Sequence, residues 1–148
     1  MNIDGLQLAI LFVAAMGAGW DIRTRTIPNW LTMSAFFGVI FFGYFFTNNE
    51  RTVYFLTLVF ASLLLWGPFF VKLLGGGDVK MLLVMAIASS IPQYALILFF
   101  VAIAGGIQAL LSGLYFKYYK KDPHPWKVPI PYGVAICIGY GLFVLFGF

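Results

Sequence analysis

Charged residues are scarce in this chain. Of its 148 residues, 9% are charged and only five are acidic, whereas 62% are hydrophobic. The mean hydropathy is +0.96. Because soluble domains carry about 25% charged residues, this composition excludes a soluble enzyme or binding module. We expect an all-α integral membrane protein with the lipid bilayer as its surroundings.

Cysteine and histidine are nearly absent as well. Cys137 is the single cysteine and His124 the single histidine. One cysteine cannot form an internal disulfide, and these two residues cannot supply the ligand cluster of a zinc site. His124 stands between two prolines of a basic loop, where a surface position is expected. We therefore expect no disulfide and no bound metal.

Long apolar runs dominate what remains. Read against prolines, glycines and polar turns, they give six segments, at residues 5–22, 30–47, 53–71, 78–91, 93–116 and 128–148. A membrane-spanning helix needs roughly 20 apolar residues. The sequence thus predicts one transmembrane domain over residues 1–148 with about six helices, and both termini on one side of the membrane.

Basic residues indicate which side that is. With six spans, Arg51 falls on one face, whereas the other face receives Arg23, Arg25, Lys72, Lys80, Lys117, Lys120, Lys121 and Lys127. Cytoplasmic loops carry the excess of Lys and Arg. We expect both termini outside and the basic loops in the cytoplasm. The net charge of +4 is then a signal of topology and anionic lipid, with no nucleic acid as partner.

The fourth segment is short. From Val79 to Ser90 it covers only ~18 Å at the rise of an α-helix, well below the ~30 Å of a bilayer core. Its cytoplasmic end should lie below the membrane surface. Irregular backbone, such as that expected at Gly75-Gly76-Gly77, is tolerated at this depth where it lines a wet cavity or is enclosed by protein.

Two of the five acids lie at the cytoplasmic edges of these segments. Asp21 ends the first segment and Asp78 begins the fourth. Acids at membrane depth are costly and are functional candidates by default. Two carboxyl groups that share a water can hydrolyse a peptide, because the ionised one takes the proton of the water and the protonated one donates to the carbonyl oxygen. Asp21 and Asp78 are therefore a candidate catalytic pair.

The glycines before Asp78 have two readings. Without side chains, Gly75 and Gly77 could adopt positive φ and let a substrate backbone approach the aspartate. The alternative is a helix stop followed by an aspartate N-cap, which is a common pattern. Gly-x-Gly-Asp alone leaves both open.

The combination of motifs is more specific. Gly-x-Gly-Asp78 begins a short span, Asp21 is followed by basic residues and Ile27-Pro28-Asn29, and Pro131-Tyr132-Gly133 comes late in the chain. Together they resemble the prepilin peptidase family over essentially the whole chain. That resemblance implies a GxGD-type aspartyl protease with Asp21 and Asp78 as the catalytic pair, and with no metal or cofactor. It makes Gly75, Gly76 and Gly77 the loop that meets the substrate backbone.

The resemblance also implies a substrate and a location. Members of the family cleave the leader from type IV pilin-like precursors, each with a hydrophobic helix, at the cytoplasmic face of the inner membrane. Larger members carry a cytoplasmic domain with paired cysteines that this chain lacks, and some methylate the new pilin N-terminus. The small size resembles the peptidases of tight-adherence (Flp) pilus systems, and leaves methylation open.

Other readings stay open. Lys80 is a possible supporting residue of the site, or a lysine whose head reaches the membrane surface. Archaeal preflagellin processing would use the same two aspartates. A small proton- or ion-coupled transporter would use the acids as a relay, and a structural membrane subunit would leave both motifs unexplained.

Overall fold

The computed structural model describes residues 5–46, 51–70, 74–120 and 130–146, without the side chains of 42–46 and 51–52. Its secondary structure is helical throughout these ranges. The helices are α1 Gly5–Thr24, α2 Asn29–Phe46, α3 Arg51–Phe70, α4 Gly76–Ile87, α5 Ile91–Tyr118 and α6 Tyr132–Phe146. The expected all-α fold and its six segments are thus confirmed within the described residues.

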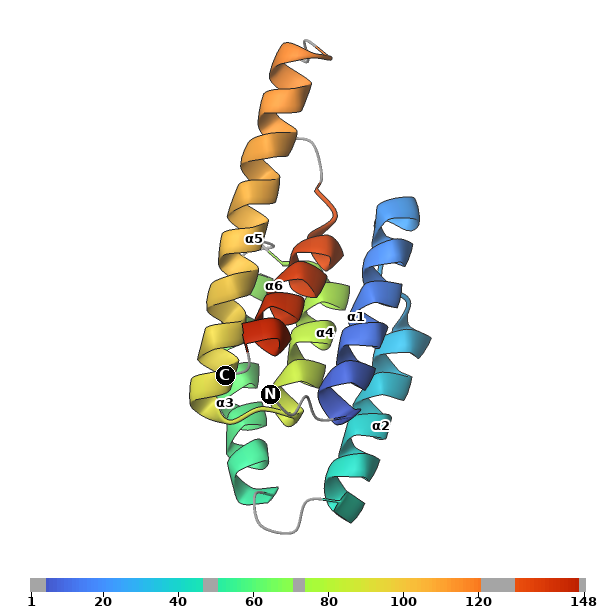
Figure 1. The fold of residues 1–148 in the computed structure, drawn as a ribbon, viewed down its shortest axis with the longest axis vertical. Helices are drawn as coiled ribbons and strands as arrows, with labels where there is room; N and C mark the ends of the chain where they lie inside the picture. The colour runs from blue at the N-terminus through green and yellow to red at the C-terminus, as the bar shows by residue number, and fades with distance from the viewer. Residues whose placement is uncertain (1–4, 47–50, 71–73, 121–129, 147–148) are drawn as a thin grey trace.

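Consecutive helices run in opposite directions (Figure 1). Helix α1 therefore begins, and α6 ends, at the same end of the bundle, while α5 extends past its neighbours at the other end (Figure 1). At this second end α1, α3 and α5 finish and α2, α4 and α6 begin, with α5 running beyond the others (Figure 1). It is the end that carries both candidate aspartates.

Three helices are long and apolar enough to cross a bilayer within the described part of the chain. They are α1, the stretch Val53–Phe70 of α3, and α5. Helix α6 is apolar but shorter, with 15 residues. Helix α4 has only 12, as the sequence predicted, so it does not match the thickness of a bilayer core.

The start of α4 differs from the expectation. It lies at Gly76 rather than near Val79, so two of the three glycines belong to the helix. Gly75 precedes it with φ −70° and ψ 151°, which is ordinary extended backbone. None of the three glycines has positive φ. The irregular backbone expected at the triple glycine is therefore not found at Gly76 and Gly77, which begin α4. At Gly75 and Gly77 close packing leaves no room for a side chain, as shown below.

Helix α4 is the centre of the bundle. It contacts each of the other five helices, whereas α6 packs mainly between α1 and α5. Met81, Met85 and Ala86 of α4 are fully buried. Large hydrophobic side chains cover the outside instead, and Leu63 is 73% exposed. An apolar exterior of this extent suits a bilayer rather than water.

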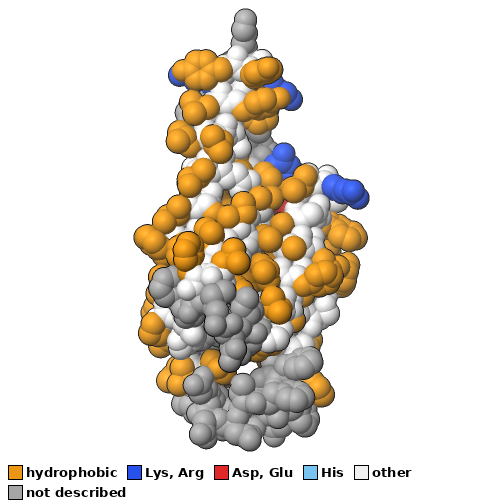
Figure 2. Space-filling model, viewed as in Figure 1, with side chains coloured by type: hydrophobic (Ala, Val, Ile, Leu, Met, Phe, Trp, Pro, Cys, Tyr) orange, Lys and Arg blue, Asp and Glu red, His pale blue; other side chains and the backbone are white. Residues whose placement is uncertain are grey.

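The Lys and Arg side chains that the structure describes belong to one part of this exterior. On the face drawn in Figure 2 they lie in the upper half, towards the end with the candidate aspartates, and hydrophobic side chains cover much of the rest. This distribution agrees with the charge asymmetry read from the sequence.

Candidate active site

Asp21 lies in the last turn of α1 and is almost completely buried, with 6% of its surface exposed. Its neighbours along this face are small: Gly17 and Ala18 are buried too. At Gly17 a Cβ would meet Met81 of α4 at 3.0 Å, whereas Ala18 faces α6, where a Cβ on Gly133 would lie 3.4 Å from its Cα. At this approach the backbone N–H of Gly133 donates to Oδ2 of Asp21 at 2.9 Å. The carboxyl group is thereby fixed between two helices that lie far apart in the sequence.

Asp78 lies in the first turn of α4 and is half-buried. The backbone N–H of Gly75 donates to Oδ2 of Asp78 at 3.2 Å. This is the half of a capping box in which a side chain in the first turn reaches back to the residue before the helix. Asp78 is therefore not the N-cap itself, and its carboxyl group is aligned with the positive end of the helix dipole.

Asp21 and Asp78 line the same cavity, whose volume is about 500 Å³. They are close enough to interact electrostatically. Among the described residues, each carboxyl group has one hydrogen bond, made by Oδ2 in both cases. The cavity is lined by Asp21, Arg25, Thr26, Ile27, Pro28, Asn29, Gly75, Gly76, Gly77 and Asp78. The structure thus brings together two acids that are 57 positions apart in the sequence (78 − 21).

Close packing explains two of the glycines. A Cβ on Gly77 would lie 2.9 Å from Cβ of Ile27, and one on Gly75 would lie 2.9 Å from Oδ2 of Asp78. Both distances are too short for real carbon atoms. At Gly76 a Cβ would meet only an ordinary contact with Phe69, at 3.8 Å. The glycines thus let α4 approach the segment after α1 and leave room for the carboxyl group. A contact between them and a substrate backbone stays a prediction.

The side chain of Lys80 binds α2 rather than either aspartate. Its Nζ donates to Oδ1 of Asn29 at 2.6 Å, and the described residues give it no other hydrogen bond. Asn29 is the first residue of α2 and lines the cavity. Lys80 thus joins α4 to α2 at the cavity wall. Sequence reasoning missed Asn29 as a site residue, although its place in Ile27-Pro28-Asn29, beside the candidate acid, was a signal.

Arg25 has an unusual backbone. Its φ is 57°, the left-handed region, and its N–H donates to the carbonyl oxygen of Asp21 at 2.9 Å. A residue other than glycine costs about 1–2 kcal/mol in this conformation. This turn ends α1 directly after Asp21 and places Arg25 on the cavity wall.

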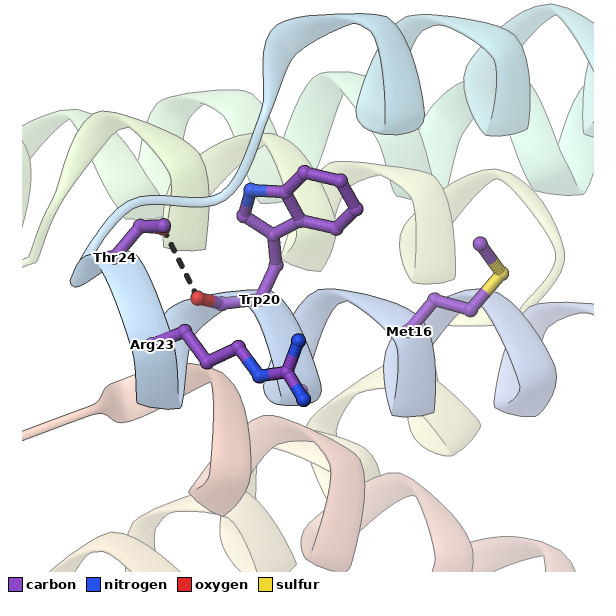
Figure 3. Close-up of a pocket in the computed structure, with 5 residues that line it drawn as sticks. Met16, Trp20, Arg23 and Thr24 are labelled. Atoms are coloured by element: carbon purple, nitrogen blue, oxygen red, sulfur yellow. Dashed lines mark hydrogen bonds between the residues drawn. The ribbon is translucent and has the colours of Figure 1, made fainter.

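Arg23 lines a different groove from the cavity of the two aspartates. A groove of about 500 Å³ on α1 is lined by Met16, Gly19, Trp20, Arg23 and Thr24 (Figure 3). Oγ1 of Thr24 donates to the carbonyl oxygen of Trp20 at 3.0 Å within this stretch. Neither aspartate lines the groove. The two arginines, both expected to act as topology anchors, therefore differ in position.

No group of three or more His, Cys, Asp or Glu side chains that could hold a metal ion occurs in the described ranges. Besides the two carboxyl groups, the polar side chains that line the cavity are those of Arg25, Thr26 and Asn29.

Comparison with protein families decides the relationship. The model of the type IV leader peptidase family matches residues 8–110, more than half of the chain. The chain belongs to the type IV leader peptidase family. The resemblance to prepilin peptidases read from the motifs is thereby confirmed. No curated protein and no solved structure matches the chain.

The matched region of this leader peptidase includes both aspartates, Lys80 and Asn29. It ends before α6, whose Gly133 donates to Asp21. Membership therefore makes the chain a leader-peptidase-like protease, and the apolar helices agree with a membrane protein.

Proposed function

We propose that this leader peptidase is an aspartyl endopeptidase that removes the leader of type IV prepilins of the Flp kind. The observation that carries the proposal is the shared cavity of Asp21 and Asp78, in a chain of this family. A single acid would not hydrolyse a peptide bond, but two that share a water can divide the work of acid and base.

The reaction needs one proton between the two carboxyl groups. Like charges at close range make it costly for both to ionise, so the pair holds one proton readily. The ionised carboxylate takes a proton from a water, whose oxygen attacks the scissile carbonyl carbon. The protonated carboxyl group donates to the carbonyl oxygen. When the tetrahedral intermediate collapses, the C–N bond breaks and the leaving nitrogen receives the proton that the base had taken. A hydroxyl group of the intermediate returns its proton to the other carboxylate as the carbonyl re-forms, which restores the pair.

Water reaches such a site because α4 is short. Its 12 residues cover only ~18 Å, and the cavity lies at its first turn. A cavity at this position opens towards the surface rather than the middle of the bilayer. The prepilin is itself a hydrophobic helix, so it can stay in the bilayer while its leader reaches the cavity from the side.

The basic residues support a cytoplasmic site. Five described basic residues lie in or next to helix ends on the side of the two aspartates: Arg23, Arg25, Lys80, Lys117 and Lys120. By the positive-inside tendency this side faces the cytoplasm. The protein then crosses the inner membrane about six times, with both termini outside.

Cleavage of a purified substrate tests this function. The full chain and a Flp-type prepilin are reconstituted together in liposomes, and the mass of the product is measured. The expected result is loss of the leader in a single cut. A prepilin that stays intact, while an archaeal preflagellin is cut under the same conditions, would contradict the proposed substrate. The same spectrum reads whether the new N-terminus is methylated.

A further inference from the structure

Gln108 is a polar side chain in the middle of a membrane helix. It lies in α5, whose sequence is otherwise almost entirely apolar here. Its Nε2 donates to the carbonyl oxygen of Pro131 at 3.0 Å, across a separation of 23 residues. Its Oε1 is buried and has no hydrogen-bond partner among the described residues. A polar side chain within a membrane helix is a functional candidate.

The partner of Gln108 is Pro131, the residue directly before α6. The carbonyl oxygen of Pro131 also accepts the N–H of Val134 at 3.2 Å, so it closes the first turn of the helix. Gly133, in that same turn, donates its N–H to Asp21. The first turn of α6 is therefore bound twice: by Gln108 at the carbonyl oxygen of Pro131, and by Asp21 at the N–H of Gly133.

Close packing against α1 also restricts movement of this turn. A Cβ on Gly133 would lie 3.1 Å from both Cβ and Oδ2 of Asp21 and 3.4 Å from Cα of Ala18. Further along α6, a Cβ on Gly139 would lie 2.6 Å from Cα of Val101 in α5. Helices with such close backbones are held by van der Waals contact and interhelical hydrogen bonds. Besides the hydrogen bond of Gly133 to Asp21, the contact of Gln108 with Pro131 is a polar contact that joins this turn to another helix.

We propose that Gln108 is a positioning residue for catalysis, which sets the carboxyl group of Asp21 through the first turn of α6. This rests on the proposed function, because it assigns Asp21 to the reaction. It extends the active site beyond the matched region of the family, to the amide of Gly133, and gives a membrane-embedded glutamine a role in the reaction geometry without contact with the substrate.

Two substitutions separate this role from simple packing. Gln108→Met keeps the shape of the side chain but has no donor, and we expect turnover of the prepilin to fall at least tenfold at every pH. Gln108→Glu donates to Pro131 only while its carboxyl group is protonated. The ratio of its turnover to that of the wild type at the same pH should therefore be highest in acid and fall as pH rises, whereas the ratio for Gln108→Met stays low at every pH.

A matched control lies at the other end of α5. Oε1 of Gln93 accepts a hydrogen bond from the backbone N–H of Ser90 at 3.0 Å, far along the helix from the cavity. Gln93→Met removes a glutamine from the same helix without touching α6, and should keep the wild-type pH profile.

A readout that does not depend on cleavage completes the test. The infrared band of the Asp21 carboxyl group, assigned by its absence in Asp21→Asn, should shift in Gln108→Met and stay in place in Gln93→Met. If wild type cleaves no prepilin, the proposed function fails, and the infrared band still decides the positioning role. Wild-type turnover, pH profile and band position in both Gln108 variants would overturn it. If Gln108→Met does not fold, Gln108→Glu in acid retains the donor and decides.

Discussion

At the scale of single residues, the site depends on two backbone donors. Gly133 holds Oδ2 of Asp21 and Gly75 holds Oδ2 of Asp78. Both donors are glycines, and at both a Cβ would press on the carboxyl group that the residue binds. The sequence could predict the two acids because each stands in a recognisable motif. It could not predict the donor of Asp21, because nothing in residues 131–133 states which helix they will face.

Substitution of Gly133 tests this arrangement. Gly133→Ala places a Cβ 3.1 Å from Oδ2 of Asp21, so the carboxyl group must move by a few tenths of an ångström. A misplacement of 1 Å can cost about 10²-fold in rate, so we expect this smaller displacement to lower turnover by about tenfold. Gly106→Ala, where nothing lies within 4 Å of the new atom, is the control and should retain wild-type turnover. Unchanged turnover in Gly133→Ala would show that the position of Asp21 is not critical.

The Lys80–Asn29 hydrogen bond gives a second prediction for single residues. If it holds α2 against α4 at the cavity wall, Lys80→Met and Asn29→Leu should each reduce the free energy of unfolding, and the double variant should lose less than their sum. Contacting pairs show coupling of about 0.5–3 kcal/mol. The measurement is a double-mutant cycle of unfolding in detergent. Additive losses would mean that the two residues act separately.

At the scale of helices, the main error of the sequence reading concerns the start of α4. Glycine has the lowest helix propensity after proline, so three in a row predict a loop. The structure instead includes Gly76 and Gly77 in the helix, and at Gly77 the approach of α4 to Ile27 leaves no room for a side chain. Tertiary packing overrides local propensity here. The other boundaries agree to within a few residues, because proline and polar turns mark them.

This packing can be tested at Gly77. Gly77→Ala would bring its Cβ to 2.9 Å from Cβ of Ile27, so α4 and the segment after α1 must separate. We expect the protein to lose about 1–3 kcal/mol of unfolding free energy, as overpacked sites do, and to cleave more slowly. Gly67→Ala in α3 meets nothing within 4 Å and should be neutral or slightly stabilising. Equal stability of the two variants, read from unfolding in detergent, would contradict this account of the glycine motif.

At the scale of the whole molecule, composition and charge alone predict much of the architecture. The scarcity of charge predicts an all-helical bundle with an apolar exterior, and the alternation of helix directions follows from short connections. Which helices meet was not predictable. Helix α6 packs mainly against α1 and α5 and only slightly against α4, and its contact with α1 brings it to Asp21.

Orientation in the membrane is a prediction of its own. In a Cys137→Ser background, Gly5→Cys marks the start of α1, and Tyr119→Cys, at a residue that is 82% exposed, marks the far end of α5. A maleimide that does not cross membranes should label Gly5→Cys in spheroplasts, and should label Tyr119→Cys only after the membrane is permeabilised. The reverse pattern would place the aspartates on the outer face and contradict a cytoplasmic site.

The central claim is that Asp21 and Asp78 act as one catalytic pair. Its most direct test is the cleavage of a co-expressed prepilin by wild type, Asp21→Asn and Asp78→Asn, with membrane insertion of each variant verified. We predict that wild type removes the leader and that each variant leaves the prepilin at full length. Full cleavage by either variant would remove that aspartate from catalysis and contradict the account.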